Sequence, residues 1–240
     1  MKKLLILFVA ILGVSPAFAQ IDDDSDFGQL SSGGRFEKPK KSAFFIGPKV
    51  GVTMTSMTQP AECDLYDGSG IGFSGGIAMK ARFGKATENS YEGTGIVGVG
   101  LELKYKQNNV KTIANDDLKL AYFEVPVILQ YYPFAKSPVM NPFYLELGGS
   151  FAALMSKSPD QLTVNLNQEW PGTKDLIYHT GDLKGFDVRP VVGLGYTIPK
   201  TGFDINARYY IGMSELAENF SCKMSTIEIS ISWLIKAARF

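Results

Sequence analysis

Residues 97–105 read VGVGLELKY, and this stretch contains two alternating kinds of residue. Every odd position from Val97 to Tyr105 is apolar, whereas the even positions hold two glycines, Glu102 and Lys104. Successive side chains of a β-strand point to opposite faces. The stretch therefore predicts a strand with one apolar face and one polar face.

The same period of two recurs in eight segments of the chain. Their apolar phases hold 44 positions without one charged residue, where the chain's 20% share of charged residues would place about nine by chance. We therefore predict an all-β protein with eight strands. The segments are residues 44–54, 73–83, 97–105, 123–131, 143–153, 186–196, 203–211 and 227–235.

The opposite phase of the same segments is polar, with small residues between the charges. It carries six cations and six anions, and we predict that they line the lumen of a closed barrel as a stabilising ionic network. These charges are Lys49, Lys80, Arg82, Glu102, Lys104, Glu124, Glu146, Asp187, Arg189, Asp204, Arg208 and Glu228.

A soluble barrel or sandwich could produce this alternation, but three features favour a membrane barrel. Each segment has 9 to 11 residues, the length that a tilted strand needs to cross a bilayer. Aromatic residues lie at the segment ends, as in the two girdles of membrane barrels. The connections alternate in length, and the odd ones total 82 residues against 30 for the even ones. We predict an eight-stranded antiparallel up-and-down transmembrane β-barrel with long external loops.

Two prolines and the last residue do not fit regular strands. Pro48 and Pro190 lie on the apolar phase inside segments, where each removes a ladder donor, so we expect a bulge or a strand end at both. The aromatic Phe240 ends the chain, as in many outer-membrane barrels, but it is out of phase with Ile235. A bulge near the end would account for this.

The first residues have the pattern of an export signal. Lys2 and Lys3 precede the apolar run 4–12, and Ala17 and Ala19 present small residues at the cleavage positions. We predict a signal peptide at 1–19, a flexible periplasmic N-terminal segment at 20–42 and the barrel at 43–240. The protein is then expected in the outer membrane of a Gram-negative bacterium, with both termini in the periplasm.

The two cysteines lie in the first and last predicted external loops. The first and eighth strands of a closed barrel are neighbours, so Cys63 and Cys222 are predicted to form a disulfide across the closing seam. Two unrelated thiols are the alternative.

Six short motifs follow one another along the chain: 47–52 GPKVGV, 72–76 GFSGG, 101–105 LELKY, 122–127 YFEVPV, 143–149 FYLELGG and 192–196 VGLGY. In this order they resemble the outer-membrane β-barrel family common in Bacteroidetes, which includes the PorT-like proteins. The resemblance covers about residues 43–235 and implies an eight-stranded outer-membrane barrel. Some relatives support type IX secretion or gliding machinery, and the family has no known catalytic residues to carry over.

The composition argues against several functions. The chain has 24 basic and 24 acidic residues, a balance that argues against a nucleic-acid partner. One His and two Cys leave little for metal or triad chemistry, so no cofactor, metal or catalytic residue is predicted.

The leading hypothesis is a non-catalytic barrel with a plugged lumen, acting through its external loops or as an accessory of a surface or secretion assembly. Its expected partners are outer-membrane lipid, the barrel-insertion machinery and a cell-surface or secretion-system protein. The longest connection, residues 154–185, carries Trp170 and the lone His179.

Two alternatives remain. The first is a lipid-modifying enzyme or protease of the outer membrane that uses His179 with Ser156, Ser158 or Thr180, although no set of nucleophile, base and orienting group is visible. The second is a soluble periplasmic carrier of the lipocalin type, whose apolar phase would line a central cavity.

Overall fold

The computed structural model describes residues 42–58, 66–83, 95–112, 116–135, 137, 139–164, 176–179, 183–199, 201–217 and 220–239. These residues form β-strands and their connections. Within these ranges no helix has the length and apolar character to span a membrane. The predicted signal peptide and nearly all of the predicted N-terminal segment lie outside the described residues.

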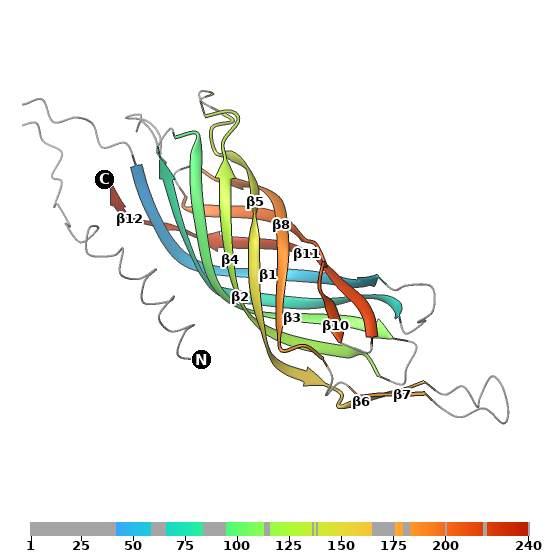
Figure 1. Cartoon of the computed structure of the whole chain (residues 1–240). Coiled ribbons are helices and arrows are strands. Elements are labelled where there is room, and N and C mark those ends of the chain that lie inside the picture. Colours follow the sequence, from blue (N-terminus) through green and yellow to red (C-terminus); the bar gives the residue numbers. More distant parts are fainter. Residues whose placement is uncertain are drawn as a thin grey trace, which may run out of the picture.

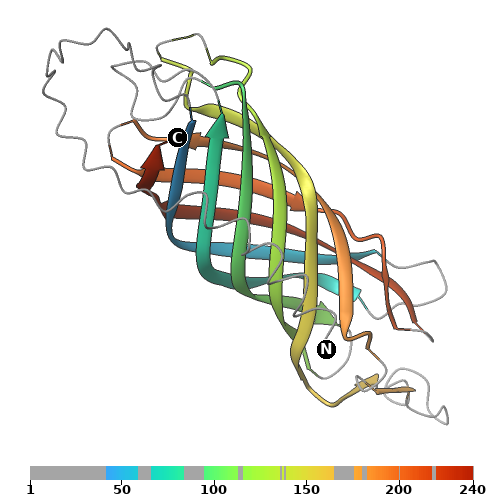
Figure 2. The same ribbon diagram turned by 60° about the vertical axis from the view of Figure 1, so that its left-hand side comes forward.

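Eight antiparallel strands form a closed barrel, as predicted (Figures 1 and 2). Each strand pairs with its neighbours along the chain, and the pairing of the first with the last closes the cylinder. The barrel strands are β1 (Ser42–Thr58), β2 (Tyr66–Phe83), β3 (Val97–Thr112), β4 (Leu118–Tyr131), β5 (Phe143–Ser158), β8 (Phe186–Thr197), β9 (Phe203–Tyr210) and β11 (Phe220–Trp233).

Four shorter strands complete the fold. The end of the barrel where β1 begins also holds β12, and we call it the terminus end (Figure 2). The opposite end, here the loop end, carries a two-stranded ribbon of β6 and β7 and the short β10 beside β11 (Figure 1). Their bounds are β6 (Gln161–Val164), β7 (Leu176–His179), β10 (Glu215–Ala217) and β12 (Ile235–Arg239).

The strand registers fix the tilt of the barrel. Following paired residues once around from Phe44 in β1 returns to Met54 in the same strand, a stagger of ten residues. Eight strands with this stagger tilt by about 40° from the barrel axis, as in known membrane barrels. The path runs through Phe44, Ala81, Val99, Leu129, Leu147, Val192, Tyr209, Ile227 and Met54.

The strand that closes the barrel is interrupted near its end. Residues 49–58 of β1 pair with β11, and residues 43–46 pair with β12. Pro48 therefore lies where the ladder changes partner. The missing N–H of this proline therefore falls at a break in the sheet. A register shift opposite Phe44 and Phe45 supplies a bulge in β12, although Phe240 itself is not described.

Pro190 lies beside the end of another ladder. It pairs with Gly149 on the β5 side, whereas pairing between β8 and β9 begins only at Val191 with Tyr210. Its carbonyl accepts a hydrogen bond of 2.9 Å from the Ile211 N–H. Both prolines thus lie at ladder interruptions.

The two faces of the wall have opposite chemistry. The apolar phase points outward, and its exposed large side chains range from 37% exposed at Ile46 to 71% at Ile71. Eleven of the twelve predicted lumen charges are at most 4% exposed, and the side chain of Asp187 is 15% exposed. A lipocalin-type carrier needs the reverse arrangement, so this alternative is not supported by the fold.

Candidate functional site

The middle of the lumen holds a tightly bonded cluster of ions, the middle cluster. Arg208 donates from Nε and Nη2 to both oxygens of Glu146, at 2.5 and 3.0 Å, and from Nη1 to Glu102 at 2.8 Å. Lys49 donates to the other oxygen of Glu102 at 2.8 Å, and Gln130 donates to Glu146 at 3.0 Å. Such bidentate, charge-assisted bonds hold the ions that burial would otherwise disfavour.

Toward the terminus end, a second cluster combines ions with aromatic rings. The Asp204 carboxylate accepts bonds from Lys80 at 3.1 Å, Thr197 at 2.5 Å and Tyr144 at 2.6 Å. Lys80 Nζ also lies 4.1 Å from the centre of the Tyr144 ring. Arg82 Nε donates to the Gly95 carbonyl at 2.9 Å.

Toward the loop end lies a third group, the loop-end cluster. Lys104 donates to Glu228 and to the Tyr210 hydroxyl, each at 2.6 Å. Lys106 stands 3.5 Å from carboxylate oxygens of Glu228 and Glu124, and its ammonium lies 3.3 Å from the centre of the Tyr210 ring. Residues on β8 complete this cluster: Arg189 and Asp187.

Apolar groups close the lumen at both ends. At the terminus end the cluster is Ala43, Phe45, Ala78 and Leu234. At the loop end the connection after β5 reaches into the barrel mouth, where Leu162 of β6 is only 3% exposed and Leu183 packs beside it. Apolar side chains therefore lie toward both ends of the lumen, and the ions form its central part. The apolar residues that close the loop end are Met57, Val110, Leu118, Leu120, Tyr122, Ala152, Leu162 and Met224.

Residues 18–218 match the outer membrane protein beta-barrel domain family, and this stretch is well over half of the chain. The chain belongs to this family. Membership supports a location in the outer membrane and agrees with the outward apolar face of the barrel. No curated protein sequence matches the chain.

Solved structures with a similar arrangement are small outer-membrane proteins. Neisserial surface protein A is 13% identical and has a TM-score of 0.42, over 80% of this chain and 97% of that one. Ail, the attachment invasion locus protein of Yersinia pestis, in complex with the heparin analogue sucrose octasulfate, is 13% identical and has a TM-score of 0.42. The match covers 80% of this chain and 99% of that one. The outer membrane protein OprG from Pseudomonas aeruginosa is 14% identical and has a TM-score of 0.36. The match covers 83% of this chain and 99% of that one.

At the loop end the strands of the outer-membrane barrel extend beyond its membrane-facing part. In this extension the outward side chains of β3 and β4 are polar, and apolar side chains are found on the inside. In β3 the inward side chain after Lys106 and Asn108 is the apolar Val110, whereas Lys111 faces outward. In β4 Leu118 and Leu120 are buried and Lys119 is exposed. An apolar inside with a polar outside is the pattern of a water-soluble barrel. We call this extension the collar: residues 106–112 of β3, 118–122 of β4 and 152–158 of β5.

Aromatic side chains mark where the outer-membrane barrel meets the collar. Phe73 and Tyr105 lie with their ring centres 5.7 Å apart on the outside of β2 and β3. At the terminus end, Phe203 and Trp233 stack at 6.5 Å. Both pairs are exposed to the outside, where amphipathic rings favour a membrane interface.

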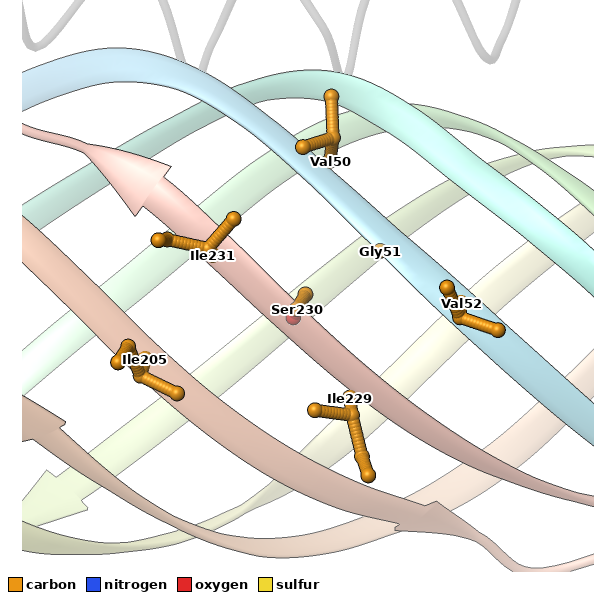
Figure 3. Close-up of a pocket in the computed structure, with 7 residues that line it drawn as sticks. All are labelled: Val50, Gly51, Val52, Ile205, Ile229, Ser230 and Ile231. Carbon is orange, nitrogen blue, oxygen red and sulfur yellow. The ribbon is translucent and has the colours of Figure 1, made fainter.

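A shallow groove on the outside wall crosses the closing seam (Figure 3). Val50, Val52, Ile229, Ile231 and Ile205 line it, and each of these side chains is at least 41% exposed. The groove lies on the outward apolar phase, which faces the hydrocarbon in an outer-membrane barrel.

The longest predicted loop is shorter than expected. β5 continues to Ser158, so Ser156 and Ser158 belong to a strand, and His179 lies in β7 with its backbone opposite Gln161. The His179 side chain is not described, and Trp170 and Thr180 lie outside the described residues. The structure adds nothing in favour of catalysis, and no group of His, Cys, Asp and Glu in the described ranges could hold a metal ion.

The predicted disulfide stays a prediction. Cys63 lies outside the described residues, and Cys222 falls within β11 instead of in the loop expected for it. Lys223, the residue after Cys222, pairs with Thr58 at the end of β1.

Sequence reasoning missed several members of the lumen. Lys106 is fully buried and gives the described lumen seven cations against six anions, but it falls one residue after the predicted third segment. The buried Tyr132, Tyr144 and Tyr210 were also missed, since an aromatic residue on the polar phase carries no charge signal. Continuing the alternation past Tyr105 would have found Lys106.

A matched pair of glycines tests how closely the lumen is packed. A Cβ on Gly195 would lie 2.3 Å from the Tyr144 ring, whereas one on Gly149 would have no atom within 4 Å. Gly195→Ala must push Tyr144 away from Asp204, and we expect it to cost about 1–3 kcal/mol of unfolding free energy. Urea unfolding in lipid vesicles should show no such loss for Gly149→Ala. Equal values for the two variants would contradict the packing described.

Proposed function

We propose that this chain is a non-catalytic outer-membrane barrel with a plugged lumen that acts through its external loops. The observation that carries the proposal is the directly bonded middle cluster of ions, with apolar side chains toward both ends of the lumen. The buried ions form direct bonds to one another, which is the arrangement of a structural network and not of an ion path.

In the proposed orientation both termini face the periplasm and the loop end faces outward. The short connection between β8 and β9, residues 198–202, lies at the terminus end, as short periplasmic turns do. The collar and the ribbon of β6 and β7 then stand outside the membrane, where a rigid scaffold can present them to a partner.

The assembly that the loops serve is the finer part of the proposal. The motifs quoted above resemble the PorT-like proteins of Bacteroidetes, which supports an accessory role in a surface or secretion assembly of the type IX kind. A cell-surface or secretion-system protein is then the expected partner, beside outer-membrane lipid and the barrel-insertion machinery.

Planar-bilayer recording tests the plug. We expect the refolded chain to show no stable open conductance of nanosiemens size, because the directly bonded side chains of the middle cluster block the lumen. A known porin in the same bilayer serves as the positive control, and heat-modifiable gel mobility shows that the sample is folded. A reproducible open channel would reject the plugged lumen.

Site-specific crosslinking in intact cells tests the role of the loops. A photoreactive residue at Ile177, which is 55% exposed on β7, should capture a discrete protein partner. The same residue at the outward-facing Leu147 of the barrel wall is the control and should capture lipid. If Ile177 captures no protein, or if both positions capture the same amount of protein, the result counts against action through the loops.

A further inference from the structure

Six buried side-chain atoms among the described residues have no hydrogen-bond partner, and all lie in one part of the lumen. They come from four consecutive barrel strands, β3, β4, β5 and β8. Buried polar groups are nearly always paired with protein or with ordered water. The atoms are Lys106 Nζ, Asn108 Nδ2, Glu124 Oε2, Ser150 Oγ, Asp187 Oδ1 and Arg189 Nη2.

Five of the six atoms come from side chains linked by ion pairs or by cross-strand pairing, and Asn108 follows Lys106 on the inward phase of β3. Ser150 and Arg189 are direct cross-strand partners on β5 and β8. Arg189 Nη1 lies 3.5 Å from Glu124, and Lys106 Nζ lies 3.5 Å from the unpartnered oxygen of the same carboxylate. The side chains therefore face one another across the lumen in the loop-end cluster.

Glu124 is bonded less closely than the carboxylates of the middle cluster. Arg208 reaches its two carboxylate partners at 2.5 to 3.0 Å. Glu124 has its three cationic neighbours at 3.5 to 3.8 Å, too far for good direct hydrogen bonds. Contacts of this length between buried ions are typical of places where water completes the bonding.

The chemistry of the unpartnered atoms identifies the ligand. Lys106, Asn108 and Arg189 supply donors, while Glu124 and Asp187 supply acceptors and the Ser150 hydroxyl can do either. An anion would face the two carboxylates, and a cation would face the ammonium and guanidinium groups. Water both donates and accepts, so it satisfies this mixed set without an unpaired charge.

The cluster also has contact with the outside. β8 pairs with β5 from Phe186 on, but its pairing with β9 begins only at Val191, which leaves the β9-facing edge of residues 186–189 outside the ladder. The Asp187 side chain at this edge is 15% exposed, whereas Glu124 and Arg189 are fully buried. Above the cluster, Leu162 and the other apolar residues close the barrel mouth.

We propose that the loop-end cluster is a water-binding chamber inside the barrel. Internal water bridges Lys106 and Arg189 to Glu124 and occupies the space around Ser150 and Asn108. The ions of the middle cluster beneath it are bonded directly to one another without water. Water in the chamber therefore exchanges with solvent beside Asp187 and does not pass through the lumen.

The test compares two buried serines by water-selective nuclear Overhauser measurements on the full chain in nanodiscs. Ser150 should give cross-peaks to water, and Ser230, whose hydroxyl donates to Asn206 at 2.6 Å, should give none. Ser150→Val should remove the water cross-peaks of the Asn108 side-chain amide as well. Heat-modifiable gel mobility confirms that this variant is folded.

A high-resolution crystal structure of the same chain, with and without a bromide soak, provides the second measurement. Water density within 3.2 Å of at least two of the six atoms, without anomalous signal, is the expected result. Absent density together with a direct bond from Lys106 to Glu124 would overturn the proposal. An anomalous bromide peak in the chamber would also overturn it, because the ligand would then be an anion.

Discussion

Replacing Arg208 with methionine is expected to lower the unfolding free energy of the barrel by about 3–5 kcal/mol. The guanidinium donates three hydrogen bonds to Glu102 and Glu146 at the centre of the lumen, where all three side chains are nearly inaccessible to solvent. Methionine fills a similar volume but leaves the Glu146 carboxylate with only the amide of Gln130. The loss is large because a buried ion without its counter-ion keeps its full desolvation cost.

Urea unfolding of the refolded chain in lipid vesicles measures this loss. Lys111→Met removes an exposed cation from the collar and is the matched control, expected to change stability by less than about 1 kcal/mol. The double variant Arg208→Met with Glu146→Met should recover part of the loss, since it removes the unpaired ion as well. An Arg208 variant as stable as the Lys111 variant would show that the lumen ions do not hold the barrel together.

The fold could be predicted from the sequence because lipid imposes one rule on every strand. An outward side chain at membrane depth must be apolar, so the period of two persists through all eight segments. Six predicted segments lie within one observed strand, whereas 203–211 runs one residue past β9 and 227–235 spans the end of β11 and the start of β12. Lumen charges such as Lys49 and Glu146 followed from the same rule, because they occupy the other phase.

The strand ends could not be predicted in the same way. Beyond Tyr105 the strand leaves the membrane and its outward residues Gln107, Asn109 and Lys111 are polar, so the apolar phase stops although the strand continues to Thr112. For the same reason β5 runs on to Ser158 and was taken for a loop. The pairing of particular ions, such as Arg208 with Glu146, depends on the stagger of the closed barrel, which no local pattern encodes.

The membrane boundary itself can be located with one pair of variants on β5. Leu147 and Met155 are both apolar and outward, with 62% and 64% of their surfaces exposed, but only Leu147 lies in the membrane-facing part of the strand. Arginine at Leu147 must bring its charge into hydrocarbon and is expected to cost about 2–4 kcal/mol, as measured for midplane positions of other barrels.

The same change at Met155 should cost about 1 kcal/mol or less, because this residue lies in the collar, where the outside of the wall meets water or headgroups. Since the two sites share a strand, a face and a degree of exposure, the difference between the two unfolding free energies isolates the effect of depth in the bilayer. Equal costs in vesicles would mean that lipid does not surround the wall at Leu147, and the assignment of the outward apolar phase to the membrane would fail with it.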